Sequence, residues 1–237
     1  MYKEIQNKIY KGLKNTCKDG ILFNGEFYAE IKPEYLIAVN IAQAIAELNI
    51  YPGSPLIIRL EEPTEEFATR CVPNMSWEKG EEGFELFAPT IFRDKKNTER
   101  NGRFDLGIYQ EDKENPITAL ELKLVNPTKN GIIDDIKRLS EVLQLKDTTG
   151  TTKVKYTYFA CIELNEKIKF NTEVKDNLDS VKNKYKGWLE ELTDDTTDFD
   201  IVTLNIDDTL ILTPQKITGD DIFDGDQYAQ AKHFVGI

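Results

Sequence analysis

The fold is decided by a stretch that reads RFDLGIY at residues 103–109, QEDKENP at 110–116 and ITALELKL at 117–124. In the first and third segments apolar side chains alternate with other residues, which is the pattern of a half-buried strand. The segment between them is polar and contains a proline. The stretch therefore predicts two antiparallel strands joined by a loop.

Alternation along a strand assigns each side chain to one face of the sheet. The predicted apolar faces consist of Phe104, Leu106 and Ile108 on the first strand and Leu120, Leu122 and Leu124 on the second. Asp105 then points away from the first apolar face, and Glu121 and Lys123 point away from the second. If the strands pair, these three polar side chains converge on one side of the sheet.

Two carboxylates and a lysine on neighbouring strands suit a hard cation. Carboxylate oxygens are the natural ligands of Mg²⁺, which also binds substrate phosphate. Such an ion lowers the pKa of a bound water and stabilises charge on a phosphoryl oxygen. Lys123 lies one strand period from Glu121, where it can hold that water or neutralise the phosphate.

Asp105 followed by Glu121-Leu122-Lys123 resembles the PD-(D/E)xK nuclease superfamily, whose fold is the restriction-endonuclease-like fold. Phe104 stands where that family usually has a proline, at a position that varies. The resemblance covers about residues 34–164. It implies that Asp105 and Glu121 hold Mg²⁺ or Mn²⁺ with help from the Leu122 carbonyl, and that Lys123 orients or activates the attacking water.

A simpler interpretation stays open, because Glu-x-Lys on an exposed strand face usually means a weak, solvated ion pair. Two features argue against it here. Asp105 lies in an otherwise apolar strand, and both strands have apolar opposite faces, as in a central sheet covered by helices.

A helix is predicted from Pro33 to about residue 46, because proline suits a first helical turn and the segment is apolar over most of its circumference. The resemblance implies that a glutamate of this helix lies near the metal, and Glu34 is the candidate. Glu34 can equally serve to complement the positive end of the helix.

Residues 93–103 form the most basic loop of the chain and lead into the strand that carries Asp105. A basic loop beside a metal site is where a phosphate backbone would be held, although an exposed, solvated loop explains the composition equally well. With Arg138, the candidate nucleic-acid contacts are Arg93, Lys95, Lys96, Arg100 and Arg103.

A second helix is predicted over residues 131–143, where Ile132, Ile136, Leu139 and Leu143 form one apolar stripe. Asp135 and Arg138 flank this stripe. They belong to the pattern Asp-Ile-x-Arg-Leu at residues 135–139, which resembles the helix that follows Glu-x-Lys in the nuclease superfamily.

The other predicted elements complete an α/β sandwich of three layers, with a central mixed sheet flanked by helices. Helices are expected at 2–14, with an end near Asp19-Gly20, at about 65–71 and at 172–192, a hairpin at 21–29, and strands at 56–60, 84–92, 153–162, 199–205 and 210–212. We expect a single domain: an N-terminal helix and hairpin as a cap at 1–30, a core at 31–165, and a C-terminal part at 166–237 whose end is loop.

Composition limits the chemistry. The three cysteines are widely spaced without a metal-binding pattern, and the single histidine, His233, argues against mechanisms that need a histidine pair. The sequence shows no membrane span and no signal peptide, so a cytoplasmic protein is expected. The net charge of −12 is uneven, because residues 191–237 hold 11 acidic and 2 basic side chains and the other 190 hold 31 and 28.

The sequence thus predicts a metal-dependent nuclease that hydrolyses DNA, in defence against foreign DNA or in repair. A homodimer is expected, because cutting both strands needs two sites. The acidic C-terminal region is a candidate contact for a basic protein partner. The alternatives are a catalytically weak or silent nuclease fold that regulates or binds a partner, and a DNA-mimicking inhibitor.

Overall fold

The computed structural model describes ten segments of the chain: residues 1–24, 33–50, 55–71, 102–111, 115–123, 125–147, 150–165, 174–192, 200–206 and 233–236. Predictions that concern other residues lie outside these segments. Among them are the strand at 84–92, the basic loop from Arg93 to Arg100, and the strand at 210–212.

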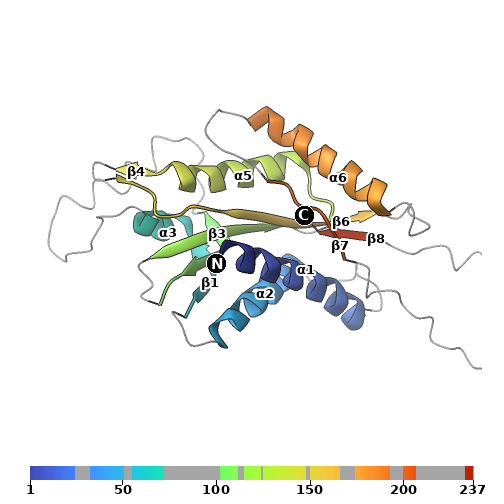
Figure 1. The fold of residues 1–237 in the computed structure, drawn as a ribbon, viewed down its shortest axis with the longest axis horizontal. Coiled ribbons are helices and arrows are strands. Elements are labelled where there is room, and N and C mark those ends of the chain that lie inside the picture. The colour runs from blue at the N-terminus through green and yellow to red at the C-terminus, as the bar shows by residue number, and fades with distance from the viewer. Residues whose placement is uncertain are drawn as a thin grey trace, which may run out of the picture.

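The sheet has a four-stranded mixed core in the order β1-β2-β3-β6, extended by β8 and β7 (Figure 1). The strands are β1 (Ile57–Pro63), β2 (Arg103–Tyr109), β3 (Pro116–Lys123), β6 (Tyr158–Asn165), β7 (Leu204–Asn205) and β8 (His233–Gly236). β2 is antiparallel to β1 and β3, whereas β6 is parallel to β3. A separate short hairpin pairs β4 (Lys146–Asp147) with β5 (Gly150–Thr151).

Helices cover both faces of the sheet. Figure 1 shows α1 (Tyr2–Asn24) and α2 (Pro33–Ala46) on one face and α3 (Thr64–Cys71), α5 (Lys129–Gln144) and α6 (Val174–Leu189) on the other. Short 3₁₀ turns follow α2 and α6, as η1 (Glu47–Ile50) and η3 (Glu190–Leu192). The predicted α/β architecture with a mixed sheet between helices is confirmed.

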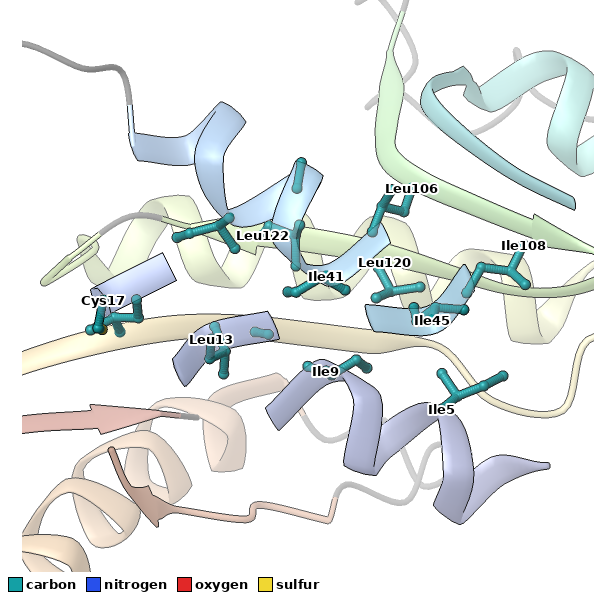
Figure 2. Close-up of a cluster of buried hydrophobic side chains, with 14 of the residues drawn as sticks. Ile5, Ile9, Leu13, Cys17, Ile41, Ile45, Leu106, Ile108, Leu120 and Leu122 are labelled. Carbon is teal, nitrogen blue, oxygen red and sulfur yellow. The ribbon is translucent and has the colours of Figure 1, made fainter. Parts of the chain in front are cut away.

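The main hydrophobic core lies between the α1–α2 layer and the sheet (Figure 2). α1 contributes residues at four-residue spacing, which places them on one side of the helix. The strands contribute every second residue, so Leu106, Ile108, Leu120 and Leu122 meet that helical stripe. The labelled side chains of α1 are Ile5, Ile9, Leu13 and Cys17.

Phe104 does not share a core with Leu106 and Ile108, contrary to the predicted strand face. It is buried in a second hydrophobic core together with Phe67 of α3, and the ring centroids of the two phenylalanines are 5.4 Å apart. Residue Glu61 of β1 has a φ of 53° beside this position, and Glu62 pairs with Phe104. Phe67 also contacts the Tyr109 ring at 5.4 Å, so packing against α3 holds Phe104 on this side, which the sequence pattern of one strand does not reveal.

α1 continues to Asn24, so the predicted helix end near Gly20 and the start of the hairpin at Ile21 are wrong. Packing against α2 explains the continuation. Gly12 lets the two helices approach so closely that a Cβ there would lie 2.5 Å from the Ile41 Cα. Near the other end of α1, Asp19 accepts a hydrogen bond from the Asn40 side chain at 3.1 Å. Tertiary contacts thus override the weak helix propensity of Gly20.

Replacing Gly12 with alanine is expected to destabilise the protein by about 1–3 kcal/mol or more, because the new methyl group meets backbone that cannot move without separating α1 from α2. Urea unfolding measures the difference. Gly187→Ala in α6 is the matched control, since nothing lies within 4 Å of its added Cβ. That variant should gain about 0.5–1 kcal/mol from helix propensity. Equal effects at both positions would contradict the proposed close packing.

Most other predicted elements are present with shifted ends. The strand predicted at 153–162 begins only at Tyr158, and the one predicted at 199–205 is reduced to Leu204–Asn205. β8 was not predicted: the C-terminal segment was expected to be loop, yet residues 233–236 pair with both β6 and β7. A four-residue strand held by neighbours from elsewhere in the chain carries little local signal.

The three cysteines are free and buried. Burial raises the pKa of Cys71 and that of Cys161 to about 12, so neither thiol is activated as a nucleophile. Within the described segments, no helix combines the length and the apolar character that crossing a membrane requires.

Candidate active site

Six ionisable side chains meet at the end of the sheet where β3 finishes. Their elements are β2, β3 and the two helices that flank this end, α2 and α5. The residues are Glu34 of α2, Asp105 of β2, Glu121 and Lys123 of β3, and Asp135 and Arg138 of α5. We call this group the carboxylate cluster.

Asp105 is fixed by the backbone of the neighbouring strand. Cross-strand pairing between β2 and β3 runs from Tyr109–Pro116 to Leu106–Leu120. Two residues past the Leu106–Leu120 pair, the backbone N–H of Leu122 donates a hydrogen bond to Asp105 Oδ2 at 2.6 Å. At this position the Asp105 side chain, in place of a backbone carbonyl, accepts the hydrogen bond from β3. This bond holds the carboxylate against the end of β3.

Glu121 is almost completely buried, with 3% of its side chain exposed. Its Oε1 atom lies 3.1 Å from Arg138 Nε, but the geometry is not that of a hydrogen bond and this oxygen has no hydrogen-bond partner. The pKa of Glu121 is raised to about 9, mainly by burial; the Asp105 and Asp135 carboxylates add to this rise, and Arg138 and Lys123 oppose it.

Asp105 and Glu121 form a coupled pair. Burial raises the pKa of Asp105, while the Leu122 N–H and a hydrogen bond with the Glu121 side chain oppose this rise. With its high pKa, the Glu121 carboxyl is protonated at neutral pH and donates to Asp105. The pair therefore holds one proton where two carboxylates face each other.

Lys123 lies between two carboxylates that come from opposite layers. Its Nζ atom is 3.2 Å from Glu34 Oε1 and 3.1 Å from Asp135 Oδ2. Burial lowers the pKa of Lys123, but Asp135 and Glu34 outweigh this and the net pKa is raised. The ammonium group is thus kept charged and held at a fixed place beside the Asp105–Glu121 pair.

Arg138 also lies in the cluster, where its guanidinium group contacts Asp135 as well as Glu121. Its contact with nucleic acid stays a prediction; in the structure its guanidinium group lies on these two carboxylates, and 31% of the side chain is exposed. Asp135 is the functional candidate that the sequence argument passed over. The sequence shows Asp135 as a charged residue beside the apolar stripe of α5, and in the structure this residue is buried.

The other predicted nucleic-acid contacts do not join the cluster within the described residues. Arg103 is exposed at the start of β2. Arg93, Lys95, Lys96 and Arg100 lie outside the described segments. The geometry therefore brings together Glu34, Asp105, Glu121 and Lys123 and adds Asp135 and Arg138.

The cluster contains four carboxyl groups but only two cationic side chains, so its carboxyl groups could accept a further cation. In the described part of the chain, no group of three or more His, Cys, Asp or Glu side chains is arranged to hold a metal ion. Mg²⁺ commonly binds through only one or two carboxylates and completes its shell with waters and substrate. The pair Asp105 and Glu121, with the unpartnered Glu121 Oε1, fits that kind of site.

Comparisons of the chain with protein-family models, with curated proteins and with solved structures found no match. A functional assignment therefore depends on the chemistry of the carboxylate cluster.

Proposed function

We propose that the chain is a metal-dependent nuclease of the restriction-endonuclease-like fold that hydrolyses phosphodiester bonds in DNA. The observation that carries this proposal is the buried Asp105–Glu121 pair beside the held ammonium group of Lys123. Two carboxylates that share a proton at the open end of a strand pair are costly for the fold, which is typical of a functional site.

The residues divide the chemistry among them. A divalent cation held by Asp105, Glu121 and the Leu122 carbonyl would lower the pKa of water and stabilise charge on the phosphoryl group. Lys123 donates to the attacking water or to a phosphate oxygen, and Glu34 and Asp135 keep its ammonium group in place. Arg138 keeps Glu121 and Asp135 oriented.

The test is cleavage of plasmid and of single-stranded DNA in Mg²⁺ and in Mn²⁺, beside a binding measurement in Ca²⁺. Cleavage that is lost in Asp105→Asn and retained in Glu65→Gln, an exposed carboxyl of α3, supports the proposal. Cleavage that persists in Asp105→Asn would show that another site or a contaminant is responsible.

Metal should also stabilise the folded protein and displace a proton. A ligand that binds only the folded state adds about 2.7 kcal/mol when its concentration is 100 times its Kd. Because Glu121 is protonated without metal, binding near neutral pH should release up to about one proton. Calorimetry in buffers of different ionisation enthalpy measures this release, and thermal melting measures the stabilisation. Glu121→Gln should abolish the proton release; an unchanged melting temperature in saturating Mn²⁺ would contradict a metal site.

A second candidate is a nuclease fold without hydrolytic activity that acts through a partner. Its specific support is that Arg138 and Lys123 already provide positive charge to the carboxylates. DNA binding in Ca²⁺ without cleavage in any metal, undiminished by Lys123→Ala, would favour this candidate.

A further inference from the structure

A cavity of about 310 Å³ opens at the end of the sheet opposite the carboxylate cluster. Its walls come from the first turns of α1, the loop between β2 and β3, and the residues that lead into β6. Seven residue steps along β3 separate Pro116, which lines the cavity, from Lys123, and this corresponds to about 23 Å. The cavity is therefore distinct from the proposed active site.

Three tyrosines form an aromatic wall in this cavity. The rings of Tyr2 and Tyr158 are stacked with centroids 5.7 Å apart, and Tyr2 contacts Tyr156 at 4.3 Å with an interplanar angle of 31°. The Tyr158 hydroxyl donates to the Tyr2 carbonyl at 3.1 Å, which fixes the first turn of α1 against β6. Tyr156 is 50% exposed, so it presents ring surface to solvent while its ring also contacts Tyr2.

Among the described residues that line the cavity, the charged side chains are lysines. Lys153 and Lys155 line the cavity, and none of the described residues lining it is Asp or Glu. This is unusual in a chain with a net charge of −12. Lys153 Nζ is 3.0 Å from Asn115 Oδ1, and this contact directs one ammonium group along the cavity wall.

Hydrogen-bonding groups complete the lining. Gln110 and Asn115 place side-chain amides at the cavity, and Thr118 adds a hydroxyl. Amides donate and accept at once, as recognition of the edge of a planar base requires. Aromatic rings that stack with bases, combined with lysines for the phosphate, are the general means of binding unpaired nucleotides.

We propose that this cavity binds an unpaired nucleotide: its base stacks on Tyr156 and its phosphate lies against Lys153 and Lys155. The ligand is either a free nucleotide or one unit of single-stranded nucleic acid, since both present the same base and phosphate. The volume fits one such unit. This inference does not depend on hydrolysis at the carboxylate cluster, and binding should not need a divalent metal.

The experiment is titration calorimetry of the full chain in EDTA with dTMP, thymidine, inorganic phosphate and a short thymidine oligonucleotide. EDTA removes any contribution of metal at the carboxylate cluster, so failure here is distinguishable from failure of the proposed hydrolysis. We expect saturable binding, with dTMP tighter than either thymidine or phosphate. Saturation by dTMP assigns a free nucleotide; saturation by the oligonucleotide alone assigns a strand.

Variants connect the binding to the cavity. Tyr156→Ala should weaken binding about tenfold through lost stacking, and Tyr156→Phe should retain it. Lys155→Ala should weaken binding and reduce its salt dependence, while the same change at Lys186, exposed on α6, should alter neither.

Three results would overturn the proposal. They are an absence of saturable binding by every probe, phosphate binding as tight as that of both dTMP and the oligonucleotide, and unchanged affinity in Tyr156→Ala. Displacement of the oligonucleotide by an acidic peptide at equal concentration would also count against it, because it would show that charge alone is recognised.

Discussion

Glu121→Gln should stabilise the protein increasingly as the pH rises from about 5 to 9. The pKa of Glu121 is raised to about 9 by burial, whereas an unfolded glutamate has a pKa of about 4.3. Between these values the folded state holds a proton that the unfolded state releases. The free energy of unfolding therefore falls with pH, by about 1.4 kcal/mol per pH unit from this group.

The sign follows from which state binds the proton. The stabilising contribution of Glu121 is fully present below the pKa of the unfolded chain and is lost as the pH rises toward about 9. Glutamine keeps the shape and the donor to Asp105 but does not titrate. At neutral pH the difference between variant and wild type should be on the order of 3 kcal/mol.

Urea unfolding at several pH values, without metal, measures this difference. Glu65→Gln makes the same chemical change at an exposed position of α3 and should leave the pH dependence as in wild type. If Glu121→Gln unfolds with the same pH dependence as wild type, the buried proton that we assign to this pair is absent.

Asp105, Glu121 and Lys123 could be placed together from the sequence because strand periodicity determines the face of the sheet to which each side chain points. Glu121 and Lys123 are two residues apart on β3 and point to the same face. Asp105 required knowledge of the pairing, which the short polar insert supplied by predicting a hairpin. The three residues therefore could be predicted as neighbours before the structure was known.

The contacts made by α5 could not be predicted in the same way. Periodicity indicated that Asp135 and Arg138 flank its apolar stripe, but it does not show whether such positions face solvent or the sheet. The structure places Asp135 over the end of β3, where the Nζ atom of Lys123 lies 3.1 Å from the Oδ2 atom of Asp135. Packing of a helix against a sheet determines this, and local sequence carries little of that information.

Long-range packing also explains the errors in the fold. α1 extends past Gly20 because α2 lies against it, and β8 exists because β6 and β7 provide partners. The side on which Phe104 packs depends on its contact with Phe67 of α3. Each of these features depends on residues far away in the chain, whereas the predicted elements were read from short windows.

Lys123→Ala is expected to lower the rate of DNA cleavage by on the order of 10²–10³, with metal binding retained. The ammonium group is held between Glu34 and Asp135, and in the proposed site it would not itself be a metal ligand. In the proposed mechanism the ammonium group donates to the water or to a phosphate oxygen as charge develops, so its loss should affect the chemical step more than substrate binding. Single-turnover cleavage, beside DNA binding in Ca²⁺, separates these effects.

A structural role for Lys123 must be distinguished from a chemical one, since its removal leaves buried Asp135 with Arg138 as its remaining cationic partner. Lys123→Met keeps the length of the side chain, and thermal melting shows whether either variant is unfolded. Lys137→Ala, on the exposed side of α5, makes the same charge change and should cleave as wild type does. A folded Lys123→Met variant with full activity would remove this residue from the mechanism, whereas a rate loss at unchanged affinity would place its ammonium group at the reacting phosphate.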